Sequence, residues 1–129
     1  MKKLLVLALL LVCKVSYANT ACKDEARKLE VTATAYTSYL GETDLTPSIS
    51  AWGDRLRPGM RVIAVSRDLM AMGLTHGTLV TVEGFDKDFI VLDKMNKRWN
   101  KKVDIYMGKD KHAALRWGKR KVNICWRYQ

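Results

Sequence analysis

Short β-type segments separated by turn signals most constrain the fold of this chain. The 129-residue sequence contains no long stretch with helical periodicity after residue 30. Val, Ile, Thr and aromatic residues, which favour strands, instead recur in brief segments. We expect strands over 31–36, 61–65, 79–82, 89–92, 103–107 and 121–126. Six short strands in about 100 residues are typical of a small closed β-barrel.

One helix is expected late in the chain, over residues 110–117 (DKHAALRW), which end at Gly118. Residues 38–60 differ from the rest, because they show little periodicity and are rich in turn formers. A connection of this length in a small domain is usually functional or disordered. Trp52 within it favours a wall of a binding cleft, although an ordered connection without ligand contacts fits almost as well. Length and the absence of an interdomain linker predict one domain over 31–129.

Residues 1–18 have the features of a secretory signal peptide. Two lysines precede a run of nine apolar residues, and small residues stand three and one positions before a cleavage point after Ala18. The apolar run is too short to cross a bilayer, so no stable membrane span is expected. We therefore predict export to the periplasm, the cell envelope or the exterior, with residues 19–30 forming a polar N-terminal arm.

The chain is strongly basic, with 23 Lys and Arg against 13 Asp and Glu. Removal of residues 1–18 takes away three lysines and lowers the formal charge from +10 to +7. An exported protein meets anionic polymers of the cell envelope, such as peptidoglycan, and nucleic acid is therefore disfavoured as a partner. Solubility alone is the simpler explanation of the charge. The sequence indicates no oligomeric state.

Two cysteines remain after residues 1–18 are removed, namely Cys22 and Cys125. In an oxidising compartment they favour one disulfide between the N-terminal arm and the last strand, and two unpaired thiols are the alternative. A lipid on Cys22 is disfavoured because no Leu stands three residues before it. His76 and His112 are isolated, and neither HExxH nor CxxC occurs, so we expect no metal and no cofactor.

Two aspartates flank a basic loop in residues 91–107 (VLDKMNKRWNKKVDIYM). Asp93 follows the expected strand 89–92, and Asp104 lies in the next strand. Because side chains alternate along a strand, Asp104 and Tyr106 share the face opposite three apolar neighbours. Apolar surroundings raise the pKa of a carboxyl group and nearby cations lower it, and the sequence leaves the sum open. An Asp at a strand end is more often a turn former or cap than a catalyst.

Several short motifs occur in a recognisable order and spacing. They are Ala35-Tyr36, Ala51-Trp52-Gly53, Ala64-Val65, Gly77-Thr78, Asp93, Val103-Asp104-Ile105-Tyr106 and Trp117-Gly118, with eleven residues between the two aspartates. This arrangement resembles the three-aspartate (3D) domain of bacterial cell-wall proteins, which is related to the catalytic barrel of membrane-bound lytic transglycosylase A. The resemblance covers about residues 31–126. It implies a mainly β fold, a six-stranded double-psi β-barrel with one short helix in its C-terminal half.

The chain departs from the pattern of this family at two places. Ser66 stands where the family has its first aspartate. Either Asp68, two residues later, takes the place of that aspartate, or the aspartate has been lost. The glycine-rich Asp-Thr-Gly loop is replaced by residues 93–100 (DKMNKRWN), which contain no glycine. These departures keep a second function open, that of a non-catalytic barrel that binds peptidoglycan or another polysaccharide.

The resemblance implies cleavage of peptidoglycan glycan strands between N-acetylmuramic acid and N-acetylglucosamine, with closure of a 1,6-anhydro ring instead of hydrolysis. One carboxyl group first protonates the leaving oxygen and then accepts the proton of the sugar 6-hydroxyl. We assign this role to Asp93. Asp104 would raise the pKa of Asp93 by repulsion between the two negative charges, or would instead hold the basic loop through hydrogen bonds. Asp68 is a weaker third catalytic candidate. Candidate glycan contacts are Tyr36, Trp52, Lys97, Arg98, Trp99 and Tyr106.

Overall fold

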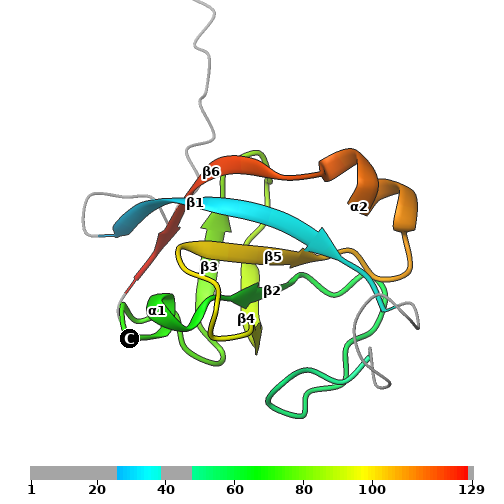
Figure 1. Cartoon of the computed structure of the whole chain (residues 1–129), viewed down its shortest axis with the longest axis horizontal. Helices are drawn as coiled ribbons and strands as arrows, with labels where there is room; N and C mark the ends of the chain where they lie inside the picture. Colours follow the sequence, from blue (N-terminus) through cyan, green and yellow to red (C-terminus); the bar gives the residue numbers. More distant parts are fainter. Residues whose placement is uncertain (1–25, 39–47, 128–129) are drawn as a thin grey trace, which may run out of the picture.

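The strands of this protein close into a barrel, as seen in a computed structural model that describes residues 26–38 and 48–127 (Figure 1). Within these residues the six strands are β1 (Arg27–Tyr36), β2 (Val62–Val65), β3 (Leu79–Val82), β4 (Phe89–Lys94), β5 (Lys102–Tyr106) and β6 (Arg120–Trp126). Two short helices accompany them, α1 (Arg67–Met70) and α2 (Lys111–Trp117). The expected mainly β class with a closed six-stranded barrel is confirmed.

The order of strands around the barrel is β1-β5-β2-β4-β3-β6. Two neighbouring pairs are parallel, β1 with β5 and β2 with β4, and the other four pairs are antiparallel. Parallel neighbours need a crossover connection, so strands that are adjacent in sequence are mostly not adjacent in the barrel. This closed six-stranded arrangement fits a double-psi β-barrel.

The elements differ from the expected ones mainly at their ends. β1 begins at Arg27, because its first residues form a long antiparallel ladder with β6 that starts from the pair Arg27 and Trp126. β4 runs on to Lys94, so that Asp93 lies within the strand. The helical turn α1 was not expected, since four residues carry too little periodicity to be recognised.

Alternation along the strands fills the barrel with apolar side chains. Val31 and Ala33 of β1 are fully buried in the core, whereas Thr32 and Thr34 between them are only partly buried. The core otherwise consists mainly of Val, Ile and Leu side chains from all six strands and α1, together with Phe89 and Trp126. Burial of this kind is the main stabilising contribution in a domain of this size.

A second apolar cluster lies outside this core and consists of Leu56, Val62 and Tyr106, with Tyr36 and Met60 packed against it. It explains why all four residues of β2 are buried, because one face of the strand meets the barrel core and the other meets this cluster. The described part of the 38–60 connection therefore packs on the outer face of the barrel.

Helix α2 has a capped start and a sharp end. The Asp110 carboxylate accepts a hydrogen bond from the backbone amide of Ala113 (2.9 Å), which is the usual way to satisfy a donor at a helix start. Gly118 follows the helix with φ 64°, a conformation that favours glycine. The predicted helix is thus confirmed within one residue of its expected start.

The predicted signal peptide and Cys22 lie outside the described residues. Cys125 is buried on β6. Its disulfide with Cys22 stays a prediction, and so does cleavage after Ala18.

Candidate functional site

Asp93 and Asp104 lie on either side of Ala64 in the barrel wall. Ala64 of β2 is in register with Asp93 of β4 on one side and with Asp104 of β5 on the other. On the far side of β5, Thr34 of β1 is in register with Asp104. Residues in register on adjacent strands point to the same face, so the two carboxylates flank the small Ala64 side chain, with Cα atoms about 10 Å apart.

A β-bulge brings Asp93 into this row. The parallel register of β2 and β4 shifts between Ile63 and Ala64, where the β4 partner moves from Val91 to Asp93. A bulge adds one residue to one strand and re-aims the side chains beyond it. Without this shift, the β4 partner of Ala64 would be Leu92, and Asp104 of β5 would be the only acid in register with Ala64 among the described strands.

Three donors converge on the Asp93 carboxylate. Its Oδ1 atom accepts hydrogen bonds from the backbone amides of Ala51 (2.7 Å) and Lys94 (3.0 Å). Its Oδ2 atom accepts one from the hydroxyl of Tyr36 (3.2 Å). The bond from Ala51 shows that the connection before β2 lies against the site. Backbone amides can only donate, so both oxygens of Asp93 act as hydrogen-bond acceptors here.

Tyr36 joins the two acids electrostatically. Burial, followed by the negative charges of Asp93 and Asp104, raises the pKa of Tyr36 far above its usual value. Its ring also packs on that of Tyr106, with centroids 5.4 Å apart and an angle of 53° between the planes. Tyr36 therefore serves as a fixed hydrogen-bond donor at neutral pH and not as a base.

Burial makes the Asp104 carboxyl group harder to ionise than an exposed Asp. Burial raises the pKa of Asp104 to about 6, and the charge of Asp93 adds to this rise. A hydrogen bond from the Thr34 hydroxyl (3.1 Å) and the charge of Lys102 act in the opposite direction. At neutral pH a protonated fraction of Asp104 is thus available for donation.

Asp68 contacts the basic loop. Its Oδ2 atom accepts a hydrogen bond from the backbone amide of Lys101 (2.9 Å), at the end of the basic loop. Burial works against ionisation, but hydrogen bonds from Ser66 and from the Lys101 backbone lower the pKa of Asp68 below its usual value. Lys101 itself adopts φ 45°, a left-handed conformation. Asp68 thus holds the loop in place, and its role as a third catalytic acid stays a prediction.

Two tryptophans near the site are already in contact with cations. The Lys102 ammonium lies 3.5 Å from the ring centroid of Trp99, and the Arg98 guanidinium lies 4.8 Å from it. Trp52 has the Lys94 ammonium 5.5 Å from its centroid. Cation–π contacts of this kind are favourable by about 0.5–1 kcal/mol at exposed sites. A sugar that stacks on Trp99 would have to displace one of these cations.

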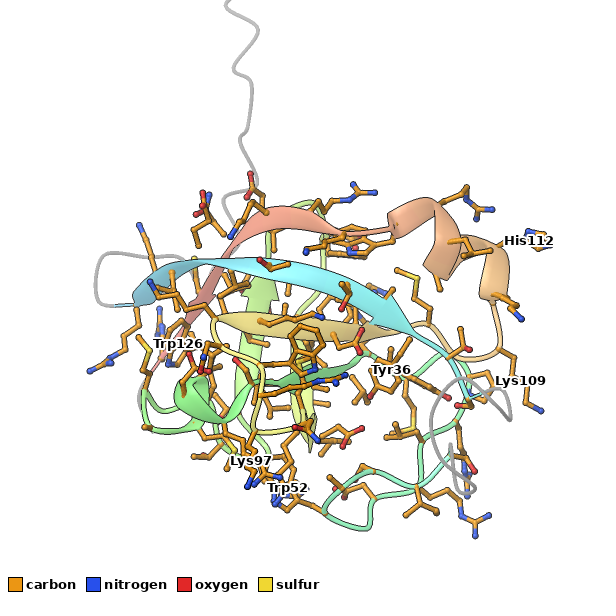
Figure 2. The ribbon with its side chains drawn as sticks, in the orientation of Figure 1. Tyr36, Trp52, Lys97, Lys109, His112 and Trp126 are labelled. Atoms are coloured by element: carbon orange, nitrogen blue, oxygen red, sulfur yellow. The ribbon has the colours of Figure 1, made fainter. Side chains whose placement is uncertain are left out.

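Trp52 also takes part in a small polar cluster that was not expected. Its ring meets that of His76 edge to face, with centroids 5.2 Å apart. His76 Nε2 lies 2.7 Å from Oδ2 of Asp54. Asp54 and Trp52 belong to the connection before β2, whereas His76 precedes β3. In Figure 2, Trp52 and Lys97 lie at the same edge of the molecule, and Tyr36 is nearer its middle.

An open pocket of about 280 Å³ lies elsewhere on the barrel. Its lining is largely apolar and includes Met60, Phe85, Phe89 and Met107. It touches Tyr106 but neither Asp93 nor Asp104. This pocket is therefore separate from the carboxylate pair.

Sequence reasoning identified Asp93, Asp104, Tyr36 and Tyr106, which the structure brings together, and missed Thr34 and Ala51. Thr34 could have been found, because it lies two residues before Tyr36 and hence on the same face of β1. Ala51 acts through its backbone amide, which leaves no signal in the sequence.

The part of the chain that the structure describes contains no group of three His, Cys, Asp or Glu residues arranged to hold a metal ion. Over the same residues, no helix is long and apolar enough to cross a membrane.

Comparison with known proteins gives a likeness of fold only. No protein-family model matches the sequence, and no curated protein is similar to it in sequence. Among solved structures, the chain is similar to the apo form of an expansin from Clavibacter michiganensis, with a TM-score of 0.53 and 17% identity. The match covers 78% of this chain and 50% of that chain, so this chain corresponds to about half of the longer protein. The relationship to the three-aspartate domain stays a prediction.

Proposed function

We propose that this protein acts on the polysaccharide of the bacterial cell wall, and that its reaction is the lytic cleavage of peptidoglycan glycan strands. The observation that carries this proposal is the pair of carboxylates on either side of Ala64, one of which is held as a hydrogen-bond acceptor while burial raises the pKa of the other to about 6. Acids in different environments divide the work of acid and base in enzymes that cleave glycosidic bonds. The barrel's likeness to an expansin agrees with the proposal at the level of the fold.

In this proposal Asp104, and not Asp93 as the resemblance implied, transfers the proton. Protonated Asp104 gives its proton to the glycosidic oxygen while the bond from C1 to that oxygen breaks. The 6-hydroxyl of the same sugar then forms a bond to C1 and returns its proton to the Asp104 carboxylate. Atoms and charge balance without water, and the product carries a 1,6-anhydro ring.

Asp93 has a supporting role in the same step. Its carboxylate is fixed by the Ala51 and Lys94 amides and by Tyr36. A fixed negative charge of this kind stabilises the positive charge that develops at the sugar ring as the bond breaks. Lys97, Arg98 and Trp52 are proposed to contact the glycan or its anionic groups, and the predicted signal peptide would deliver the protein to the wall.

A non-catalytic barrel that binds polysaccharide is the second candidate. The observation that favours it is the hydrogen bond from Thr34 to Asp104, which gives this acid a structural use in the barrel wall. The loss of the family's first aspartate at Ser66 points the same way, because this hydroxyl accepts a hydrogen bond from the Lys102 backbone and is fully buried.

The test is to incubate the chain without residues 1–18 with isolated sacculi and to analyse the soluble products by mass spectrometry. Products lighter by one water than the corresponding hydrolysis products are expected. Asp104→Asn should lower their yield by about 10²–10⁴-fold, the usual range for loss of a general acid. Asp86→Asn, at an exposed turn residue, is the matched control.

The outcomes separate the two candidates. Loss of product with Asp93→Asn but not with Asp104→Asn would return the proton transfer to Asp93. Hydrated products would identify a hydrolase. Binding to sacculi with no released product from any variant would establish the non-catalytic function.

A further inference from the structure

Positive charge gathers around helix α2, in addition to the basic loop that follows Asp93. Residues 109–121 contain six Lys and Arg and one acid, Asp110, which gives +5 of the formal +10 of the chain. The Asp110 carboxylate is engaged as the cap of the helix. The α2 patch is defined here by exposed side chains, namely Lys109, Lys111, His112, Leu115, Arg116, Lys119, Arg120 and Lys121.

Leu115 lies within this patch and is 72% exposed, more than the other exposed large apolar side chains in the described residues, Leu79 (55%) and Ile49 (38%). On a helix, residues three and four apart are neighbours, so Leu115 lies beside Lys111 and His112. The barrel contacts α2 through the partly buried Trp117, whereas most of the Leu115 side chain is left to solvent.

The α2 patch is well separated from the proposed glycan site. In Figure 1, α2 lies at the upper edge of the barrel, where it connects β5 to β6. Figure 2 shows His112 at the upper right and Lys109 at the right of the view, both directed outward, whereas Trp52 and Lys97 lie at the lower edge. One face can therefore be occupied while the other stays open.

We propose that the α2 patch binds the surface of an anionic lipid bilayer. Its cations contact lipid phosphates, and Leu115 enters the boundary between the headgroups and the acyl chains. Basic residues around an exposed apolar side chain are the pattern of segments that lie at a membrane interface. A soluble polyanion would account for the cations but not for Leu115. This inference does not depend on the proposed function.

The rigid end of α2 supports this role. Arg120 stacks on Trp117, with its guanidinium 3.9 Å from the ring centroid, and donates to the carbonyl oxygens of Trp117 (3.0 Å) and Arg116 (3.4 Å). The Trp117 indole donates to the carbonyl oxygen of Ala33 in β1 (3.3 Å). The patch is thus presented by a helix that is fixed to the barrel wall.

The experiment uses the chain without residues 1–18, because the apolar run would itself bind lipid, and this chain keeps every described strand and helix. Flotation with vesicles of phosphatidylglycerol and phosphatidylcholine measures the bound fraction, with pure phosphatidylcholine as the reference. Each cation near an anionic surface contributes roughly a factor of five to partitioning. The triple change Lys111→Gln, Arg116→Gln and Lys119→Gln should therefore weaken binding about 100-fold.

Leu115→Ser separates a bilayer from a polyanion, because it preserves all charges. We expect it to weaken vesicle binding about fivefold, as for partial burial of one leucine. Leu79→Ser on β3 is the matched control and should leave binding unchanged. A paired change of Lys97→Gln and Arg98→Gln, which removes charge from the other face, should also leave most binding intact.

Several results would overturn the proposal. Equal binding to pure phosphatidylcholine would remove the role of charge, and unchanged binding of the Leu115→Ser variant would reduce the patch to a site for polyanions. If the Lys97 and Arg98 changes weakened vesicle binding more than the α2 changes do, lipid would bind the face that carries Lys97 and Arg98 and not the α2 patch. Circular dichroism of each variant establishes that the barrel is folded.

Discussion

The hydroxyl of Tyr36 donates a hydrogen bond to Oδ2 of Asp93 over 3.2 Å, from the last residue of β1 to a strand three positions away in the barrel. The same side chain packs on the ring of Tyr106 in β5 and against the apolar cluster that contains Val62 of β2. Tyr36 therefore ties together the four strands that carry the candidate site.

Removal of this hydroxyl tests the connection. Tyr36→Phe keeps the ring on Tyr106 but leaves Asp93 with its two backbone donors. We expect the free energy of unfolding to fall by about 1–2 kcal/mol, the range for a hydrogen bond to a charged group in a partly buried place. Urea titration measures the change. Tyr106→Phe is the comparison in the same titration, because it removes a hydroxyl that bonds to Ser38 and not to the Asp93 carboxylate.

Asp104 should make the stability of the protein depend on pH. Its pKa is about 6 when folded, whereas an unfolded Asp titrates near 3.9. Between these values the folded state binds more protons, so the free energy of unfolding falls as pH rises from about 4 to about 6 and stays lower above that range. The loss from this group amounts to about 2–3 kcal/mol.

Asp104→Asn should remove that dependence. An Asn oxygen can still accept the hydrogen bond from Thr34, and the side chain carries no charge to bury. The variant is therefore expected to be more stable than the wild type at pH 7 and about equally stable at pH 4. Urea unfolding across this range compares the two slopes, and parallel slopes would contradict the assignment of the raised pKa to Asp104.

Lys101 offers a stability test within the basic loop. Its φ of 45° is uncommon for a residue with a side chain, and its amide is held by Asp68. Lys101→Gly should raise the free energy of unfolding by up to about 1 kcal/mol, because glycine adopts this conformation without steric cost. Lys97→Gly, at a residue without a positive φ, should not stabilise. Thermal melts compare the midpoints of both variants with that of the wild type, and only the Lys101→Gly midpoint should be higher.

The Asp68 carboxylate stabilises the loop only while it is ionised. Its lowered pKa means that this contribution is present above the ordinary Asp value and is lost as pH falls through the folded one. Asp68→Ala should therefore lower stability at pH 7 by about 1–2 kcal/mol and matter less in acid. Chemical denaturation at both pH values measures this. If Asp68→Ala lowered stability equally at both pH values, the charge of the carboxylate would not be involved.

Gly108 allows the connection before β2 to approach the end of β5 closely, because it has no Cβ atom. A Cβ atom at this position would lie 3.0 Å from Cα of Pro58, and its φ is 60°. Gly108→Ala should therefore destabilise by about 2–3 kcal/mol, since backbone must move. Gly77→Ala has a similar φ of 87° but open space around the added atom, so it should cost only about 1 kcal/mol. Urea midpoints of the two variants give the comparison.

Much of the fold could be predicted from the sequence, because burial imposes alternation on each strand. Val103 and Ile105 enter the core and Asp104 does not, as the pattern indicates. The start of β1 at Arg27 could not be predicted in this way. Its first residues are mostly polar, and the strand is held there by the ladder to β6, which depends on distant residues.

The candidate site was predictable in its parts but not in its arrangement. Asp93, Asp104 and Tyr36 could be named from motif order, yet the row around Ala64 depends on a bulge in β4 that no local signal announces. The same limit applies to Asp68. Its sequence position near Ser66 suggested a catalytic acid, whereas the structure shows a bond to the Lys101 backbone.

The strand order has a consequence for how the chain reaches its folded state. β1 is made first, yet both of its neighbours, β5 and β6, come from the last third of the chain. The barrel cannot close until synthesis or transport has delivered these strands, and folds with such distant pairings form slowly. Until then β1 exposes two unpaired edges, which are sites of misassembly in incomplete chains. A truncation that removes β6 should consequently yield an aggregating protein and not a smaller barrel.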